Sequence, residues 1–522
     1  MAKNSRTPRA SGHVPASSRE FDALRAGVES VTAGAAGLLS TRHIANGDEI
    51  DYADKTATFS KGHAQRGPGL VDLEAFRSFR NAVDAHLGAE WEVGLDAALS
   101  GVVPPPPPKA ASRDYAAELI ELYWASLLRD RPFSSYEYEV TAIAAARELD
   151  GLGDAYRGPR DSEGRVTPKT LFRGGLKRGG KSYFPGEAFG PYVSQLLLHP
   201  ACMGAQPLDR KFRTYRAGVD YLTEERDWAW VQNAGLPSEA AQFDPVRRHL
   251  RDGRSLAAFA YDDGIFQVYY VAHRVMAELR LGPNPGSPYS SDWNRGLLPV
   301  SGRADIVGTL NSVARVALDA VYLPIWNVHL RHRPEAGGGL LHLAKTHRGS
   351  LILNRAAGGR DELHDIVMSS PAVKLSYMKH GSYLLSQAYP EGAPSQPSYP
   401  SDRGAVAGAC VTALKFYYDC ERAISSYAQV IEPSADGLLL KSYLGFDAAQ
   451  MTFNSELGKL AHNVSFGHGM HAGANWRSDV EEGLLLGEAI ALAWLKSHAQ
   501  SLRERFSVKI RKFDGELETI GN

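Results

Sequence analysis

The sequence predicts an all-α fold with long loops. Apolar residues recur at spacings of three and four in several segments, most clearly in residues 117–128 (AELIELYWASLL), and this spacing is typical of an amphipathic helix. The alternation that marks half-buried strands is nearly absent. Hydrophobic residues make up 43% of the 522 residues and charged residues 22%, a balance that lets a chain of this length bury a large core.

Helical patterns follow a run of five prolines, Pro104–Pro108, which must be extended. We expect helices over 117–128, 256–279, 304–323, 373–387, 405–418, 451–463 and 480–498. Long loops rich in Gly, Pro and Ser lie at 157–178, 281–298 and 391–403. Loops of this length inside a compact domain are usually functional.

The N-terminal residues 1–20 contain Lys3, Arg6 and Arg9 among Ser, Pro and Gly, and no apolar core follows them. This composition predicts a disordered leader rather than a secretory signal. We expect residues 21–522 to form one helical domain. No run reaches the roughly 18 apolar residues that a membrane span needs, so we expect a cytoplasmic protein without a membrane partner.

The charge and cysteine counts limit the possible partners and the compartment of the protein. Lys and Arg (58) nearly cancel Asp and Glu (59), so we expect no nucleic-acid partner, because such proteins usually carry a basic face. Cys202, Cys410 and Cys420 are too widely spaced for a disulfide framework or a zinc site. We interpret them as small buried residues of a reducing compartment.

The first segment rich in side chains that could act in catalysis or binding is 325–336, at the end of a long apolar helix. Pro334 ends or kinks that helix and leaves Arg333 at its mouth. The favoured interpretation of His329 and His332 is that they lie on a packed or solvated face of the helix. Their i, i+3 spacing would also suit a shared metal, but a third ligand is missing.

The second segment, 389–404, precedes a helix of small residues. After Pro400, Ser401 or Asp402 can cap that helix. A helix N-terminus with a Ser and Arg403 beside it can hold an anion or a polarised carbonyl oxygen. Simple capping is the alternative interpretation.

The third segment, 463–479, places His468 and His471 in a Gly-rich turn before an apolar helix. Histidines in such a turn are more open to a pocket than histidines on a packed face. A general-base or hydrogen-bonding role is favoured over a metal site.

In order and spacing, these three segments resemble the signature motifs of vanadium-dependent haloperoxidases, especially bacterial members of natural-product pathways. Other segments that look like this family are Asn46–Glu49, Phe59–Gly62, Glu121–Asp130, Phe172–Gly174, Gly190–Gln195, Tyr389–Gly392 and Gly408–Thr412. The resemblance covers nearly the whole chain. It implies one haloperoxidase-like domain over 21–522, with the site motifs in 325–479, built as two four-helix bundles around a deep pocket and usually found as a homodimer.

The resemblance also shows which family residues are replaced. The matching positions are Trp326, Arg333 and Ser401. The replaced positions are Ile325 for a Lys, Gln396 for a His, Asp402 for a Gly, Arg403 for the acid–base His, and Asn475 for the His that bonds vanadium. The Arg of the third motif falls on Gly469, or on His468 after a shift of one residue.

These replacements predict that vanadate is not held, because cations are lost and the anionic Asp402 is added. We therefore expect no cofactor and no metal. What remains can take a proton from a hydroxyl while cations stabilise an oxyanion, as an α-hydroxyketone rearrangement requires. Resemblance to the vanadium-independent homologues of napyradiomycin-type pathways implies the substrate, a prenylated naphthoquinone-derived meroterpenoid whose prenyl group makes a 1,2-shift.

The expected roles divide the site residues into groups. The candidate bases are His468, His471 and Asp402; the oxyanion stabilisers are Arg403 and Arg333; the hydrogen bonders are Ser401, Gln396 and Asn475; and Trp326 and Ile325 contact the substrate. The alternatives are a non-catalytic binding or partner protein and a residual vanadium-dependent chloroperoxidase. Phosphatase chemistry on the same scaffold is a further interpretation, but it also needs the His that Asn475 replaces, so Asn475 argues against it.

Overall fold

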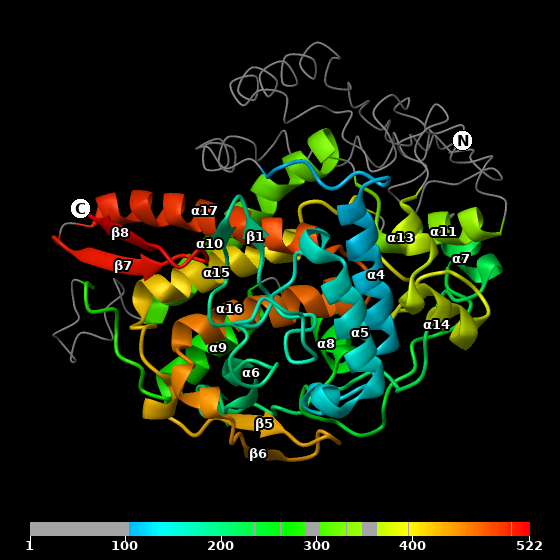
Figure 1. Ribbon diagram of the computed structural model, residues 1–522. Coiled ribbons are helices and arrows are strands. Elements are labelled where there is room, and N and C mark those ends of the chain that lie inside the picture. The colour runs from blue at the N-terminus through cyan, green and yellow to red at the C-terminus, as the bar shows by residue number, and fades with distance from the viewer. Residues whose placement is uncertain are drawn as a thin grey trace, which may run out of the picture. The chain divides into compact units, whose positions relative to one another are not determined.

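Helices dominate the computed structural model (Figure 1). It describes residues 104–232, 236–261, 264, 266–287, 303–329, 331–346, 363–394, 396–502 and 504–522. The predicted leader 1–20 and the first part of the predicted domain lie outside these residues. The strands among them form only two-stranded antiparallel hairpins. The all-α class is therefore confirmed.

One group of helices packs around α15 (Asp402–Tyr417) and α17 (Arg477–Ser501). Its other members are α10 (Arg303–Leu323) and α16 (Phe453–Phe466). The α15 and α17 backbones approach so closely that a Cβ at Gly408 would collide with the carbonyl of Leu484. Glycine is required there, and it locks the helix of the second motif against the helix that follows the third.

A second group surrounds α4 (Arg113–Leu127). Ser112 caps this helix, because its hydroxyl accepts from the Tyr115 amide. Its neighbours are α5 (Val140–Gly151), α11 (Pro334–Lys345), α13 (Asp365–Met368) and α14 (Pro371–His380). Most of α4 is buried, from Tyr115 to Ser126, so this helix is the centre of its group. The π-helical turn η7 (Gly467–His471) contacts both α4 and α17 and lies where the two groups meet.

The remaining described elements are helices, turns and hairpins. The helices are α6 (Gln195–Leu198), α7 (Glu225–Gln232), α8 (Gly253–Tyr261), α9 (Gln267–Glu278) and a π-helical turn η4 (Pro324–His329), and the 3₁₀ turns are η1 (Phe133–Tyr138), η2 (Gly153–Ala155), η5 (Ile424–Ser426) and η6 (Phe446–Gln450). The hairpins are β1–β2 (Lys177–Arg178, Lys181–Ser182), β3–β4 (Cys202–Met203, Gln206–Pro207), β5–β6 (Ile431–Pro433, Leu440–Ser442) and β7–β8 (Ser507–Arg511, Leu517–Gly521). In β7–β8, Val508 pairs with Ile520.

Two helix predictions need correction. The pattern over 256–279 forms two helices, α8 and α9, because the sequence between them contains two aspartates and Gly264. The helix expected over 373–387 ends at His380, because Gly381 has a φ of 72° and caps α14 in the left-handed conformation. The other five predicted helices are confirmed within a few residues.

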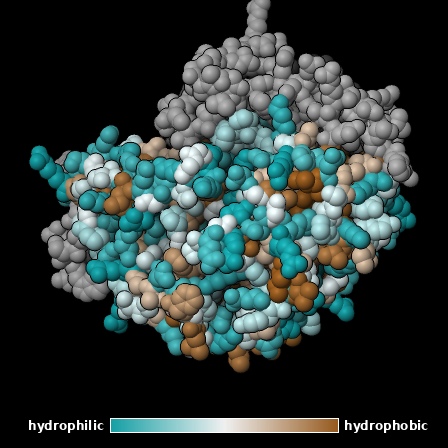
Figure 2. Space-filling view, viewed as in Figure 1, coloured by the Kyte–Doolittle hydropathy of each residue, from teal (hydrophilic) through white to brown (hydrophobic). Residues whose placement is uncertain are grey.

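The described surface in Figure 2 is mostly hydrophilic, with small separate apolar patches. None of the described helices combines the length and the apolar character needed to cross a membrane. All three cysteines are free thiols, and Cys410 and Cys420 are buried, which confirms that these two behave as small core residues.

Candidate functional site

The three motif segments meet around one buried carboxylate, Asp479. Its Oδ1 accepts from Arg331 Nη1 at 2.7 Å, and its Oδ2 accepts from Asn475 Nδ2 at 3.2 Å. Its backbone carbonyl accepts from the Ser401 amide at 2.8 Å. The fold therefore brings the first, second and third motif segments together, as their expected roles require.

Arg333 precedes Pro334, the first residue of α11, and its side chain is buried. Its guanidinium donates to the carbonyls of Gln396 (2.8 Å), Ala474 (3.2 Å) and Pro397 (3.2 Å), and to Asn475 Oδ1 (2.9 Å). Burial lowers the pKa of Arg333, opposed chiefly by Asp402. Four of the five guanidinium N–H groups are thus committed to protein oxygens, and Arg333 is a fixed positive charge.

Asn475 stands where the resemblance places the vanadium-bonding histidine. Its amide is fully buried, and both of its ends have partners: Oδ1 accepts from Arg333, and Nδ2 donates to the Ser398 carbonyl at 3.0 Å and to Asp479. The side chain therefore ties the third motif to the other two.

The second motif begins α15 as predicted. The Ser401 hydroxyl accepts from the Gly404 amide at 3.2 Å, which is the expected helix cap. Asp402 Oδ2 accepts from Gln396 Nε2 at 2.7 Å, and Oδ1 accepts from the Arg403 amide at 2.7 Å. The Arg403 guanidinium donates to the Tyr261 carbonyl at 3.3 Å. Gln396 and Asp402 thus hold each other at the start of the helix.

His468 lies in η7, and its ring stacks on Tyr389 with centroids 5.9 Å apart. No described residue bonds its Nδ1, although the side chain is buried. Burial, with the charges of Arg403 and Arg333, holds the pKa of His468 well below the usual value. His468 is therefore a neutral imidazole in the field of two arginines.

Gly469 and His468, the two positions that the resemblance offers for the Arg of the third motif, both lie in the π turn η7. Both residues are buried.

His471 does not join this group, although it is only three residues from His468. Its Nε2 lies 2.9 Å from the Tyr192 hydroxyl, and its ring packs 5.6 Å from Phe133. Burial, with the charge of Arg129, lowers the pKa of His471 to about 3.

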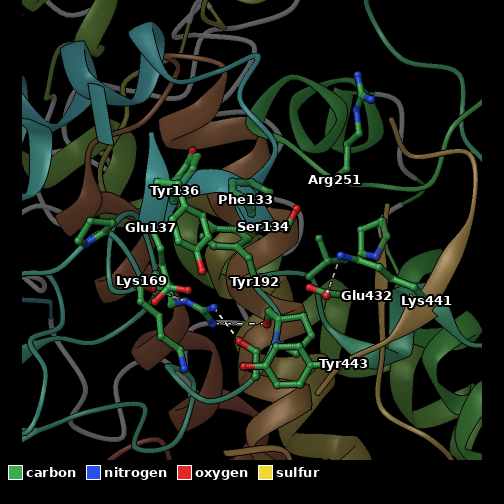
Figure 3. Close-up of a pocket in the computed structure, with 17 residues that line it drawn as sticks. Phe133, Ser134, Tyr136, Glu137, Lys169, Tyr192, Arg251, Glu432, Lys441 and Tyr443 are labelled. Atoms are coloured by element: carbon green, nitrogen blue, oxygen red, sulfur yellow. Dashed lines mark hydrogen bonds and ion pairs between the residues drawn. The ribbon is translucent and has the colours of Figure 1, made fainter. Parts of the chain in front are cut away.

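The aromatic residues beside His471 line a separate cavity of about 210 Å³ (Figure 3). Phe133 and Tyr192 stack there with ring centroids 3.7 Å apart. Lys169, on the wall of the cavity, is paired with Asp447, and Lys441 is paired with Glu432. The charges of these two lysines are therefore balanced within the protein.

Two predicted substrate contacts lie in η4. Ile325 is buried in the hydrophobic core. The side chain of Trp326 lies outside the part that the structure describes. His332 bonds the Tyr115 hydroxyl at 2.8 Å through Nε2, and its pKa falls to about 3 because it is buried beside Arg331. It behaves as the packed histidine that the sequence favoured.

Sequence reasoning missed the acids that organise the site. Asp479 and Glu118 are buried and bind Arg331, Glu118 at 2.8 Å. Burial raises the pKa of Asp479 to about 6, against the lowering effect of Arg331. A further buried ion pair joins Arg477 to Glu121, with nitrogen and oxygen 2.6 Å apart. The sequence did carry a signal for these buried acids: Glu118 and Glu121 are charged residues inside an otherwise apolar helical pattern.

Known proteins resemble this chain along most of its length. No family model matches it. The chain is 31% identical to a vanadium-dependent bromoperoxidase of Ascophyllum nodosum over 78% of its length and 72% of that protein. It is 30% identical to vanadium-dependent bromoperoxidases of Corallina officinalis and Corallina pilulifera, each over 92% of its length and 86% of the relative.

A solved structure shows the same fold. It is the homohexameric second vanadate-dependent bromoperoxidase of Ascophyllum nodosum, with a TM-score of 0.75, 22% identity, and coverage of 99% of this chain and 94% of that one. The expectation that no cofactor is involved is contradicted, because these relatives are vanadium-dependent. With 30% identity over 92% of its length to such enzymes, the chain belongs to the vanadium-dependent haloperoxidase family.

Proposed function

We propose that this protein catalyses an α-hydroxyketone rearrangement in which a prenyl group migrates to the neighbouring carbon of a naphthoquinone-derived substrate. One observation carries the proposal: His468 is a buried neutral imidazole whose Nδ1 is bonded by no described residue, and it lies in the field of Arg333 and Arg403. A proton acceptor beside two cations suits a reaction that moves negative charge between two neighbouring oxygens.

The reaction needs one proton to move twice. His468 Nδ1 accepts the proton of the carbinol, the prenyl–carbon bond shifts to the adjacent carbonyl carbon, and the former carbonyl oxygen becomes an alkoxide. His468 then returns the proton to that alkoxide, so the product is an isomer of the substrate. A low pKa makes His468 a weak base but a ready donor, and the arginine charges lower the energy of both alkoxides.

The two arginines have different contacts. Arg333 is held by four protein oxygens, so its contribution is a fixed positive charge. Arg403 is half-buried at the start of α15, where the helix N-terminus adds its own positive potential. We assign Arg403 the direct contact with the substrate oxygen. Asp402, held by Gln396, orients that end of the site.

The relatives' dependence on vanadate makes that anion the cofactor to test here. As they stand, the described contacts do not fit it. Asn475 has both ends of its amide engaged, Arg333 has one N–H group left, and the carboxylate of Asp402 lies in the second motif. A multivalent anion is costly to bury where its charge is poorly compensated.

A second candidate is peroxide-dependent halide oxidation, which the full-length similarity to bromoperoxidases favours. It differs from the first in its product, because it adds a halogen, whereas rearrangement leaves the mass unchanged. A non-catalytic partner protein would do neither.

A matched pair of histidine variants tests the proposal. Purified protein is incubated with a prenylated hydroxy-naphthoquinone ketone, with and without vanadate, and chromatography with mass spectrometry follows the isomer. We expect His468→Phe to lose about 100-fold or more in turnover, as for a lost acid–base group, and His471→Phe to keep most of it. Equal activity of His468→Phe and the parent protein would sink the proposal, as would a brominated product formed only with vanadate, peroxide and bromide.

We also propose that the protein is a cytoplasmic homo-oligomer. The solved neighbour is homohexameric, whereas the family resemblance implies a dimer. Mass photometry separates the two, and a monomer at micromolar concentration would overturn this proposal. Cell fractionation checks the location.

A further inference from the structure

We infer that Asp479 is a positioning residue that acts on Arg333 through the amide of Asn475. This inference rests on the proposed function only in giving Arg333 a role in the reaction. The contacts themselves form one continuous chain from Glu118 through Arg331, Asp479 and Asn475 to Arg333.

Asp479 is itself held from several sides. Arg331 Nη1 donates to its Oδ1 at 2.7 Å, and the Trp476 amide donates to its Oδ2 at 2.9 Å. Arg331 is in turn bound by Glu118 at 2.8 Å. All of these groups are buried, so the carboxylate has one well-defined position from which it meets Asn475.

That position selects the orientation of the Asn475 amide. Two acceptors, Asp479 Oδ2 and the Ser398 carbonyl, face one end of the side chain, and a donor, Arg333 Nη1, faces the other. A flipped amide would set oxygen against two acceptors and N–H groups against a guanidinium. Asp479 therefore keeps Oδ1 aimed at Arg333.

Arg333 depends on this arrangement because its other partners are backbone carbonyls. Asn475 Oδ1 is its only described side-chain acceptor. Neutralising Asp479 should release the amide, and the guanidinium then loses its single side-chain anchor. Simple electrostatics predicts a different result, since removing a negative charge near a cation would only strengthen the field at the site.

Chemical labelling of Arg333 tests the chain of contacts without relying on turnover. Folded protein is treated with phenylglyoxal, and the rate at Arg333 is read by peptide mass spectrometry. In Asp479→Asn we expect a rate about tenfold higher, as for the loss of one hydrogen bond to a charged group. The matched control is Glu482→Gln, which neutralises another buried acid of α17, one that pairs with Arg178 at 2.5 Å. The control should leave the Arg333 rate unchanged.

Asn475→Leu provides a second variant should Asp479→Asn fail to fold. It breaks the same chain while Asp479 keeps Arg331, and it should release Arg333 equally. On the rearrangement assay, both variants should lower kcat about tenfold with KM unchanged, since a charge that acts on the transition state affects kcat.

The outcomes separate this inference from the proposed function. Faster labelling of Arg333 in protein that shows no rearrangement would support the chain of contacts and overturn the function. Labelling rates that match the parent in both variants would overturn the inference, whatever the activity.

Discussion

Arg331 and Arg333 lie two residues apart and are both buried, yet their surroundings differ. Arg331 forms ion pairs with Glu118 (2.8 Å) and Asp479 (2.7 Å). The described partners of Arg333 are carbonyl and amide oxygens. Burial lowers the pKa of both, but for Arg331 the two carboxylates outweigh it and the net shift is upward. One charge is neutralised inside the fold, and the other is left for a ligand or a transition state.

The difference separates stability from function. A charge paired with two buried acids cannot serve a ligand without breaking those pairs, whereas a charge held by neutral oxygens can. Replacing the two arginines should therefore have opposite effects on stability and turnover.

Replacing Arg331 should damage the fold most. Arg331→Met leaves Glu118 and Asp479 buried without their cation, and removing one partner of a buried ion pair costs about 3–5 kcal/mol. Urea unfolding measures the loss in free energy of unfolding. Arg178→Met is the control, because that arginine is partly exposed and pairs with one acid, Glu482. Equal losses in the two variants would contradict the assigned role of Arg331.

Replacing Arg333 should affect chemistry more than stability. Arg333→Met breaks no ion pair with a carboxylate of the described residues, so it should unfold at higher urea than Arg331→Met. Turnover of the rearrangement should fall about 100-fold, the usual effect of removing one group that stabilises an oxyanion. Unchanged turnover would show that its charge is structural.

The histidine beside Arg331 predicts a pH effect on stability. The pKa of His332 is about 3 in the folded protein because of burial and Arg331, below its ordinary value of 6.5. Its contribution to stability is therefore complete above pH 6.5 and is lost as the pH falls from 6.5 towards 3. His332→Phe should reduce the slope of unfolding free energy between pH 6 and 4 by about 1.4 kcal/mol per pH unit. Urea titrations at several pH values measure the slope, and a slope equal to that of the parent would show that His332 is not neutral in the fold.

The smallest effect concerns the start of α15. Ser401→Ala removes the cap on the Gly404 amide and should cost about 1 kcal/mol. Because this hydroxyl serves the helix, turnover should change less than in Arg333→Met. A large loss of turnover without loss of stability would instead give Ser401 the substrate contact that the sequence suggested.

Much of the fold was predictable because helix spacing and capping residues are local signals. Ser401 caps its helix where the sequence places the cap, whereas Pro334, which was expected to end or kink a helix, is the first residue of α11. The end of α14 at Gly381 was missed, since apolar residues continue the pattern beyond a residue whose left-handed conformation stops the helix.

The candidate site was predictable as a set of segments but not as a set of contacts. Motif order brought Arg333, Asn475 and Asp402 into consideration. It could not show that Asn475 binds Arg333. Nor could it show that His471 faces Phe133 and Tyr192, whereas His468 lies in the field of the site arginines. Those facts depend on side-chain directions set by tertiary packing. The role of Asp479 was missed for the same reason.

The π turn at Gly467–His471 separates two histidines that a regular helix would keep together. In an α-helix, residues three apart lie on the same face. In this turn the ring of His468 stacks on Tyr389, whereas His471 contacts Tyr192 and Phe133. One short segment therefore supplies imidazoles to two different surroundings, and the two can be altered independently.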